Sequence, residues 1–253
     1  MSARKSRKVL FDPASTEPFP LSRSKVQAWI DCPRCMYFDR RLGLTQPGPP
    51  SMMLNRAVDV LLKAEFDQYR ERANAHPIMA KHGIDAVPFR HPDLATWRSN
   101  FKGIRLLHRP TNFMLYGAVD DIWVTPSGEL LVVDYKGTAS AKSEPQNLDA
   151  EYRQGYKRQL EFYQFLLRGN GFTVARRAYI VYAVGKIDRP TFDAKVLFDM
   201  QLLEHLGNTD WIEPTLLKIK ETLMLDSPPP PAPDCELCRY IEAVAKASEN
   251  RQD

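Results

Sequence analysis

Two acidic residues and one lysine lie on adjoining apolar stretches near the middle of the chain. The stretch GAVDD contains Asp120, and the stretch LLVVDYK contains Asp134 and Lys136. Pro126 to Gly128 between them predicts a tight turn, so the two stretches are expected to pair as a hairpin. Side chains two residues apart on a strand point to one face, and the hairpin can therefore bring all three groups together.

This combination of side chains suits metal-assisted chemistry on phosphate esters. Two carboxylates supply hard oxygen ligands for Mg²⁺ or Mn²⁺, and such an ion polarises a phosphodiester and lowers the pKa of a bound water. A lysine beside them can orient that water or stabilise the negative charge of the transition state. The alternative is an ordinary surface ion pair between Asp134 and Lys136. The apolar run before Asp134 indicates a buried strand, where unpaired charge is costly, and this favours a functional site.

The four cysteines form two CxxC pairs near opposite ends of the chain. The pairs are Cys32 with Cys35 and Cys235 with Cys238. In a reducing compartment such pairs indicate a metal or a cluster rather than disulfides. Four thiolates suit an iron–sulfur cluster or tetrahedral Zn²⁺, and their spacing does not choose between them. Either group would join the N-terminal helices to the C-terminal segment; the alternative is four unliganded cysteines.

Apolar periodicity and turn signals predict the elements that must position these residues. Helices are expected over residues 22–30, 36–38, 53–72, 151–168 and 202–225 and near 94–101, and strands over 112–125, 129–136, 172–184 and 194–200. We expect a flexible basic tail over residues 1–20, one domain over 21–226, and a proline-rich connector over 227–253 that returns its CxxC pair to the N-terminal one.

The composition is that of an ordinary globular protein. Hydrophobic residues make up 43% and charged residues 26% of the chain, which excludes a disordered or fibrous class. The net charge of +4 permits a polyanionic partner without establishing one. No apolar run is long enough for a membrane span, and no N-terminal signal segment is visible, so we expect a cytoplasmic protein with no membrane partner.

Several motifs in order resemble the PD-(D/E)xK nuclease superfamily, in particular its RecB-like and Cas4-like branch. SKVQAWIDCPRCMYF looks like the opening of that branch, GAVDD and VVDYKGT look like its metal-binding strands, and QLEFY looks like its QxxxY helix. The resemblance spans most of residues 22–240. It implies an α/β fold with a restriction-endonuclease-like core, in which a central mixed β-sheet is flanked by helices and a four-cysteine site joins the N- and C-terminal segments.

The resemblance also implies a Mg²⁺- or Mn²⁺-dependent deoxyribonuclease in DNA repair, recombination, or mobile-element or CRISPR-related processing. A helicase or another repair or recombination protein would be its partner. Asp120, Asp134 and the Tyr135 carbonyl would bind the ion, and Lys136 would assist the water. The alternatives are a catalytically silent nucleic-acid-binding or assembly module that keeps the fold, and a zinc-stapled protein-interaction domain.

Two further residues match the QxxxY helix of that branch. Gln159 and Tyr163 are four residues apart, so they share one helix face and could reach the metal site or the nucleic-acid backbone. The alternative for Tyr163 is a place in the core.

The sequence departs from the branch at two points. Where members often carry a metal-binding His on the long helix, this chain has Asp59, which could ligate Mg²⁺ or simply pair with Lys63 one turn later. Members frequently hold a four-iron cluster on one N-terminal and three C-terminal cysteines, whereas this chain has two at each end. The resemblance implies a 4Fe–4S cluster at the four cysteines, with Zn²⁺ as the alternative.

Basic and aromatic residues near the motifs are candidates for contacts with nucleic acid. Such basic residues would bind phosphates, and such aromatic residues would stack on unpaired bases. The alternative for the basic residues is a solvated helix face, and the alternative for the aromatic residues is the core. The basic candidates are Lys142, Arg153, Lys157 and Arg158, and the aromatic candidates are Trp97 and Tyr152.

Overall fold

The structure is a computed structural model that describes residues 9–46, 48, 53–140, 148–150 and 153–249. The chain divides into two compact units, one formed by residues 1–49, 107–115 and 211–253 and the other by residues 50–106 and 116–210. The units are interleaved along the chain, whereas the division made from the sequence is consecutive. That division stays a prediction.

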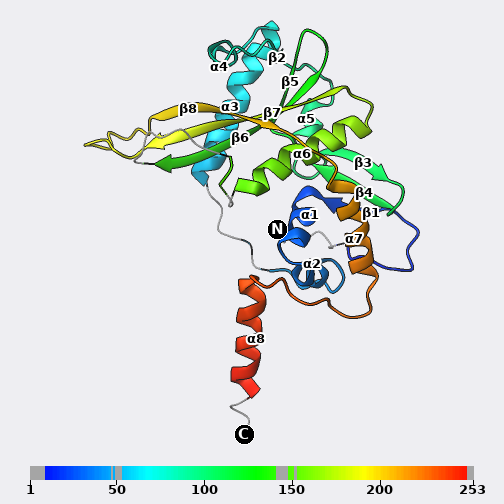
Figure 1. The fold of residues 1–253 in the computed structure, drawn as a ribbon. Coiled ribbons are helices and arrows are strands. Elements are labelled where there is room, and N and C mark those ends of the chain that lie inside the picture. Colours follow the sequence, from blue (N-terminus) through cyan, green and yellow to red (C-terminus); the bar gives the residue numbers. More distant parts are fainter. Residues whose placement is uncertain (1–8, 47, 49–52, 141–147, 151–152, 250–253) are drawn as a thin grey trace, which may run out of the picture. The chain divides into compact units, whose positions relative to one another are not determined.

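The larger unit is built on a five-stranded mixed sheet, which confirms the expected fold class (Figure 1). Its order is β2 (Val87–Pro88), β5 (Asp121–Val124), β6 (Leu130–Ser140), β7 (Val174–Lys186) and β8 (Phe198–Leu206). β6 and β7 run parallel, and the other neighbours are antiparallel. A parallel pair needs a crossover connection, and helix α6 (Gln154–Gly169) provides it.

Helix α3 (Met53–Arg72) packs on one face of this sheet, and α6 lies on the other face (Figure 1). Val58, Leu62 and Phe66 recur every four residues along α3 and face the sheet. The Phe66 ring stacks on Trp123 with 5.6 Å between centroids. The short helices α4 (Pro77–Lys81) and α5 (Leu94–Trp97) belong to the same unit.

The smaller unit holds most of a second sheet and four helices. The sheet has the order β1 (Phe19–Ser22), β4 (Phe113–Gly117) and β3 (Ile104–His108), and the helices are α1 (Arg23–Asp31), α2 (Pro33–Arg40), α7 (Ile212–Met224) and α8 (Glu236–Glu249). Part of the expected N-terminal tail is packed here, because Phe11 and Phe19 are buried and their rings meet edge-on at 5.3 Å. Residues 1–8 of that tail lie outside the described residues.

The strand expected over residues 112–125 is in fact two strands in different sheets. β4 ends at Gly117 and β5 begins at Asp121. Between them the Val119 N–H donates to the Trp97 carbonyl at 3.1 Å, which takes the backbone out of a strand ladder. The prediction of one strand was wrong because both halves are apolar. They differ in the strands with which their backbones form hydrogen bonds, and the local sequence does not show this difference.

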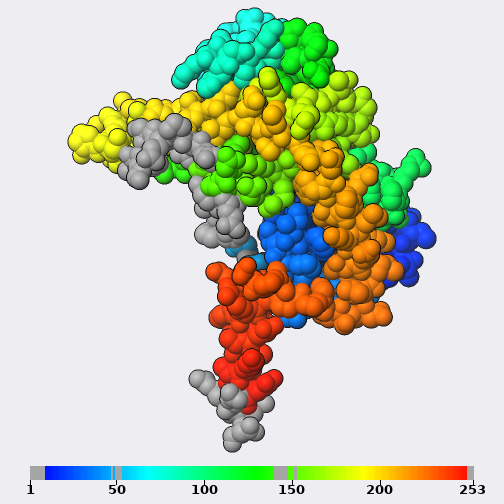
Figure 2. All heavy atoms as spheres, in the orientation of Figure 1, coloured from blue at the N-terminus to red at the C-terminus, as the bar shows by residue number. Residues whose placement is uncertain are grey.

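The helix expected over residues 202–225 was also placed too early. Residues 198–206 form β8, which pairs antiparallel with β7 from Arg177 opposite Leu206 to Gly185 opposite Phe198. The helix begins only at Ile212. The edge of β7 that faces away from β6 has backbone N–H and C=O groups that need hydrogen-bond partners. Residues 202–206 supply these partners, and they therefore form a strand instead of a helix. The β7–β8 hairpin projects from the rest of its unit (Figure 2).

The strand expected over 194–200 was likewise placed too early, since it is β8 at residues 198–206. The remaining predicted elements lie within a few residues of where the sequence placed them. Their ends move from 94–101 to 94–97, from 151–168 to 154–169, and from 172–184 to 174–186. Within the described part of the chain, no helix is both long and apolar enough to cross a membrane.

Candidate active site

The expected hairpin forms and brings the two acidic residues to its open end. β5 pairs with β6 from Val124 opposite Leu130 to Asp121 opposite Val133. Continuing this register by one residue places Asp120, at a bend, across from Asp134. Opposed residues on an antiparallel pair have neighbouring side chains, so the two carboxyl groups lie side by side.

Asp120 is held by groups from α3 and β6. Its Oδ2 accepts a hydrogen bond from the Tyr135 N–H at 3.0 Å, and its Oδ1 lies 2.9 Å from the Lys63 ammonium. Burial by itself would raise the pKa of Asp120, but the positive charges of Lys63 and Lys136 and the Tyr135 N–H together lower it. Asp120 is therefore an ionised carboxylate.

Asp134 is the most deeply buried carboxylate of the site, with 1% of its surface exposed. One of its oxygens forms an ion pair with Lys136, and the other, Oδ1, has no hydrogen-bond partner among the residues that the structure describes. Burial, together with the negative charge of Asp120, raises the pKa of Asp134 to about 7. A buried carboxylate oxygen without a partner, next to a second carboxylate, is a donor set that fits a divalent cation.

Lys136 remains charged in this position. Burial would lower its pKa, but Asp134 and Asp120, and further off Tyr163, raise it above the usual value. The Lys136 ammonium also stands 5.1 Å from the centre of the Tyr156 ring. A permanently protonated lysine can donate hydrogen bonds and supply positive charge, but it cannot act as a general base.

Gln159 and Tyr163 contact each other on α6. The Gln159 side-chain amide donates to the Tyr163 hydroxyl at 3.0 Å, and Tyr163 is buried close enough to Lys136 to influence its pKa. The helix thus brings the two residues toward the site through Lys136. Their catalytic role stays a prediction.

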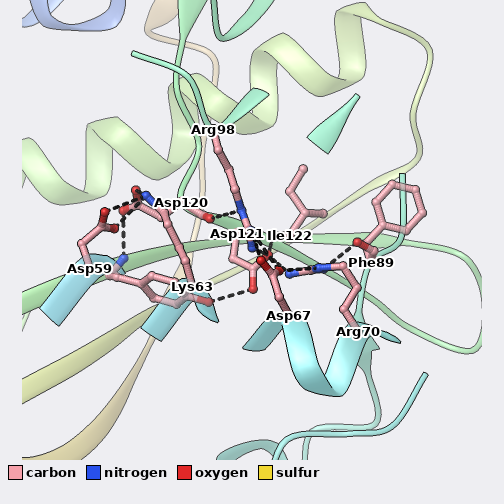
Figure 3. Close-up of polar contacts among 10 residues, drawn as sticks. Asp59, Lys63, Asp67, Arg70, Phe89, Arg98, Asp120, Asp121 and Ile122 are labelled. Carbon is pink, nitrogen blue, oxygen red and sulfur yellow. Dashed lines mark hydrogen bonds and ion pairs between the residues drawn. The ribbon is translucent and has the colours of Figure 1, made fainter. Parts of the chain in front are cut away.

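Asp59 forms the ion pair with Lys63 that the sequence offered as the alternative to a ligand role. The Lys63 ammonium lies 2.7 Å from one oxygen of Asp59 and 2.9 Å from Asp120. The pair is therefore part of the site and links α3 to the bend before β5 (Figure 3). The sequence does not reveal Lys63 as part of this site, because Lys63 and Asp120 are 57 residues apart in the chain.

Comparison with known proteins identifies the family. The family model described as the PD-(D/E)XK nuclease superfamily matches residues 47–243, which is well over half of the chain. The chain belongs to this superfamily. The resemblance seen in the sequence is thus confirmed at the level of the superfamily, and its RecB-like and Cas4-like branch stays a prediction.

The superfamily signature fits the strands described above with one difference. Asp134, Tyr135 and Lys136 spell its (D/E)XK part, and the residue before Asp120 is Val119 where the signature has proline. No curated protein matches the chain. A solved structure titled "Crystal structure of SSO0001" is 18% identical with a TM-score of 0.42, over 85% of this chain and 80% of that one.

A buried ionic cluster supports the bend that carries Asp120 (Figure 3). Its centre is the fully buried carboxylate of Asp121, which pairs with Arg70 at 2.5 Å and Arg98 at 2.9 Å. The Tyr135 hydroxyl donates to the other Asp121 oxygen at 2.7 Å. The Arg98 Nε donates to the Asp120 carbonyl at 2.9 Å, so Arg98 fixes the backbone of the metal-binding candidate.

Arg98 is expected to contribute strongly to stability and to the geometry of Asp120. We expect Arg98→Gln to lower the free energy of unfolding by about 3–5 kcal/mol, because Asp121 would keep only part of its compensation in a buried position. Arg98→Lys should recover only part of this loss, since lysine cannot form the same fork of hydrogen bonds. Urea denaturation measures both effects.

The control is Arg105→Gln, because Arg105 is exposed and its side chain donates to the Lys102 carbonyl at the surface. Equal denaturation midpoints for the Arg98 and Arg105 variants would refute the prediction.

The four cysteines meet in the smaller unit, as the sequence predicted. Their potential ligand atoms all lie within 4.8 Å of one another. Cys32 stands at the junction of α1 and α2 and Cys35 in the first turn of α2, while Cys235 precedes α8 and Cys238 lies in its first turn. This arrangement ties residues near both ends of the chain into one group that can hold a metal.

Two thiols of this group, those of Cys32 and Cys238, differ in pKa. Despite its burial, the pKa of Cys32 falls to about 7, because the backbone N–H groups of Ala232 and Cys35 and the neighbouring thiols hydrogen-bond its sulfur. Burial raises the pKa of Cys238 to about 11. Cys32 therefore forms a thiolate more readily than Cys238 does.

The candidate nucleic-acid contacts differ in their surroundings. Trp97 is buried with 8% exposure and stacks on His91, so it is core, as the alternative held. Lys157 pairs with Asp149 at 2.7 Å, and the buried Arg153 stands over the Tyr182 ring at 5.3 Å. Arg158 lies on α6, half-buried. Lys142 and Tyr152 lie outside the described residues.

Proposed function

We propose that this chain is a divalent-metal-dependent nuclease that hydrolyses DNA phosphodiester bonds and belongs to the RecB-like and Cas4-like branch of its superfamily. The observation that carries the proposal is the unsatisfied oxygen of buried Asp134, beside ionised Asp120 and the ammonium of Lys136. A folded protein tolerates such a group where an ion is to be bound.

Asp120, Asp134 and the Tyr135 carbonyl would hold the ion. On a strand, the N–H and C=O of one residue point to the same side. The Tyr135 N–H points toward Asp120, so its carbonyl faces the same open end of the hairpin and can join the two carboxylates. Asp59 would bind more weakly or through water, because Lys63 already pairs with it.

The residues around the ion have distinct tasks in the proposed reaction. When bound, Mg²⁺ or Mn²⁺ would polarise the phosphodiester and lower the pKa of the attacking water. The Lys136 ammonium orients that water and offsets the negative charge that develops on the phosphate. Tyr156 and Tyr163 stand beside Lys136 and restrict where its ammonium can lie, while Lys63 balances the charge of Asp120.

The intact acidic pair and lysine favour an active enzyme over a silent binding module. A module that only binds nucleic acid would not need to bury Asp134 without a full set of partners, because that burial costs stability. A role in DNA repair, recombination, or mobile-element or CRISPR-related processing, with a helicase or another repair protein as partner, rests on the sequence resemblance.

Cleavage assays with matched lysine variants test the proposal. We expect Mg²⁺- or Mn²⁺-dependent cleavage of single- or double-stranded DNA that stops in EDTA, and a loss of about 100-fold in Lys136→Ala. Lys246→Ala, on the exposed side of α8, is the control and should cleave like the wild type. A wild-type protein that cuts neither DNA nor RNA with either metal would favour the silent module.

For the cysteine group we propose Zn²⁺ in place of the iron–sulfur cluster that the resemblance implies. The sulfur atoms of Cys32 and Cys238 lie 3.9 Å apart, and those of Cys35 lie 3.5 Å from Cys235 and 3.6 Å from Cys238. Four sulfurs at about 2.3 Å from one tetrahedral zinc ion are about 3.8 Å from one another. In a four-iron cluster each cysteine binds a different iron atom, which holds the sulfurs further apart.

A further inference from the structure

The ammonium of Lys63 lies among three carboxylate oxygens. It is 2.7 Å and 2.9 Å from the two oxygens of Asp59 and 2.9 Å from Oδ1 of Asp120 (Figure 3). A lysine ammonium has three N–H donors and no acceptor, so the three oxygens match its three donors. All three residues belong to the larger unit of the chain.

These contacts go beyond the ion pair that a helix forms along its own surface. A pair of Asp59 with Lys63 one turn later needs no other element. Lys63, however, also reaches Asp120, which lies 57 residues further along the chain at the bend before β5. The side chains of Lys63 and Asp120 are 21% and 22% exposed, so this contact is mostly shielded from solvent. The packing of α3 on the sheet therefore positions the ammonium at a carboxylate of the candidate active site.

The oxygens around Lys63 are of the kind that a divalent cation binds. Mg²⁺ and Mn²⁺ take hard carboxylate oxygens. Sites that cleave phosphodiesters with two ions hold these ions about 3.5–4 Å apart, which is close enough for both to contact one carboxylate. Asp120 contacts Lys63 and also lies beside Asp134. Asp120 is thus next to two positions for positive charge, and an ammonium fills one of them.

An ammonium and a divalent ion exclude each other at this position. Both need the same oxygens of Asp59 and Asp120, and their like charges repel. Without the ammonium, the two carboxylates would surround the same space with no positive charge between them. Such a pair of carboxylates attracts a cation from solution, because each negative charge disfavours the other.

We propose that the ammonium of Lys63 takes the position of a second divalent ion, so that this site works with a single ion. The proposal rests on the proposed function for the ion at Asp120 and Asp134. Lys63 is a positioning residue in this scheme, because it acts through Asp120 and does not touch the substrate. The number of bound ions, and not only the rate of cleavage, should therefore change when Lys63 loses its charge.

Counting the bound Mn²⁺ ions tests this inference without any nucleic acid. The purified protein, with its cysteine site left as isolated, is titrated with Mn²⁺, and the free ion is measured by electron paramagnetic resonance. The wild type should bind one Mn²⁺ per chain. Lys63→Met keeps most of the aliphatic stem without the charge and should bind two. Lys63→Arg keeps the positive charge and should bind one.

Three further variants separate the loss of the ammonium from general effects. Lys63→Gln repeats the measurement with a neutral polar side chain and should also bind two ions. Adding Asp59→Asn to Lys63→Met removes a ligand of the gained ion and should return the count to one. Lys81→Met, at an exposed lysine of α4 in the same unit, is the matched control and should bind one ion. Circular dichroism of each variant checks the fold.

The rate of cleavage gives a second measurement of the number of ions. The wild-type rate should rise hyperbolically with the Mn²⁺ concentration, as it does when a single ion binds. A sigmoidal rise would indicate that two ions bind together and would overturn the inference.

The outcomes distinguish this inference from the proposed function. If the wild type cleaves DNA but binds two ions, the role of Lys63 is refuted and the nuclease proposal stands. The same holds if neither Lys63→Met nor Lys63→Gln binds more ions than the wild type. If the ion counts are as expected but neither DNA nor RNA is cleaved, the inference on Lys63 stands and hydrolysis is refuted.

Discussion

Asp134→Asn is expected to keep the metal-free protein at least as stable as the wild type while abolishing its response to divalent ions. Asparagine has the shape of aspartate without its charge. In the folded protein burial and the neighbouring Asp120 raise the pKa of Asp134 to about 7, so ionisation of Asp134 costs folding free energy as the pH rises through that value. At pH 8 the variant avoids this cost, although Lys136 loses one of its two acidic partners.

Denaturation with and without Mn²⁺ measures this effect. A ligand at about 100 times its Kd adds about 2.7 kcal/mol to the stability of a protein that binds it only when folded. The wild type should gain stability in this way and Asp134→Asn should not, while cleavage by the variant should fall by about 1,000-fold.

Asp93→Asn is the matched control for this substitution, because its side chain is 65% exposed. The control should respond to Mn²⁺ like the wild type. If Mn²⁺ stabilised Asp134→Asn as much as it stabilises the wild type, the ion would bind elsewhere, and the proposed ligand set would be wrong.

Removing one thiolate is expected to have the largest effect on stability. In Cys238→Ser the hard hydroxyl oxygen replaces a soft thiolate, and the remaining three sulfurs bind Zn²⁺ more weakly. Binding free energies of structural zinc reach about 10–16 kcal/mol in small peptides, so even a partial loss should exceed the effect of most core substitutions. We expect the smaller unit, which contains all four cysteines, to unfold at lower denaturant concentration than the wild type.

Metal analysis and proteolysis after anaerobic purification test this prediction. The wild type should be colourless with one zinc ion per chain; a brown protein that contains iron would refute the assignment of zinc. Both Cys238→Ser and Cys235→Ser should lose the metal and become sensitive to proteolysis between residues 211 and 249. Because Cys238 is buried and Cys235 only half-buried, a loss in Cys238→Ser alone would indicate disturbed packing rather than a lost ligand.

Much of the candidate active site was predictable because its geometry is local. The alternation of a strand places Asp134 and Lys136 on one face, and a tight turn forces the preceding strand to return beside them, which brings Asp120 opposite Asp134. The two CxxC pairs were likewise recognisable, since few other arrangements of four cysteines suit a metal so well.

Other parts of the site were beyond prediction because their partners are remote in sequence. Lys63 was visible only as a helical partner of Asp59, and its second partner, Asp120, is chosen by the packing of α3 on the sheet. The role of Arg98 at the Asp120 carbonyl depends on how the end of the short helix α5 packs against the bend before β5, and the pattern that predicts a helix there does not reveal this contact. Nothing in the local pattern placed Tyr156 beside Lys136.

Sequence alone determined which chemistry the chain carries, because residue types and short-range periodicity set the faces of single strands and helices. Tertiary structure decided where strands end, which strands pair, and which charges neutralise each other. The break between β4 and β5 and the conversion of residues 202–206 into β8 both follow from hydrogen-bond partners that come from elsewhere in the chain. A backbone group or a buried charge must be satisfied by whatever lies next to it in space, and the local sequence does not record that neighbour.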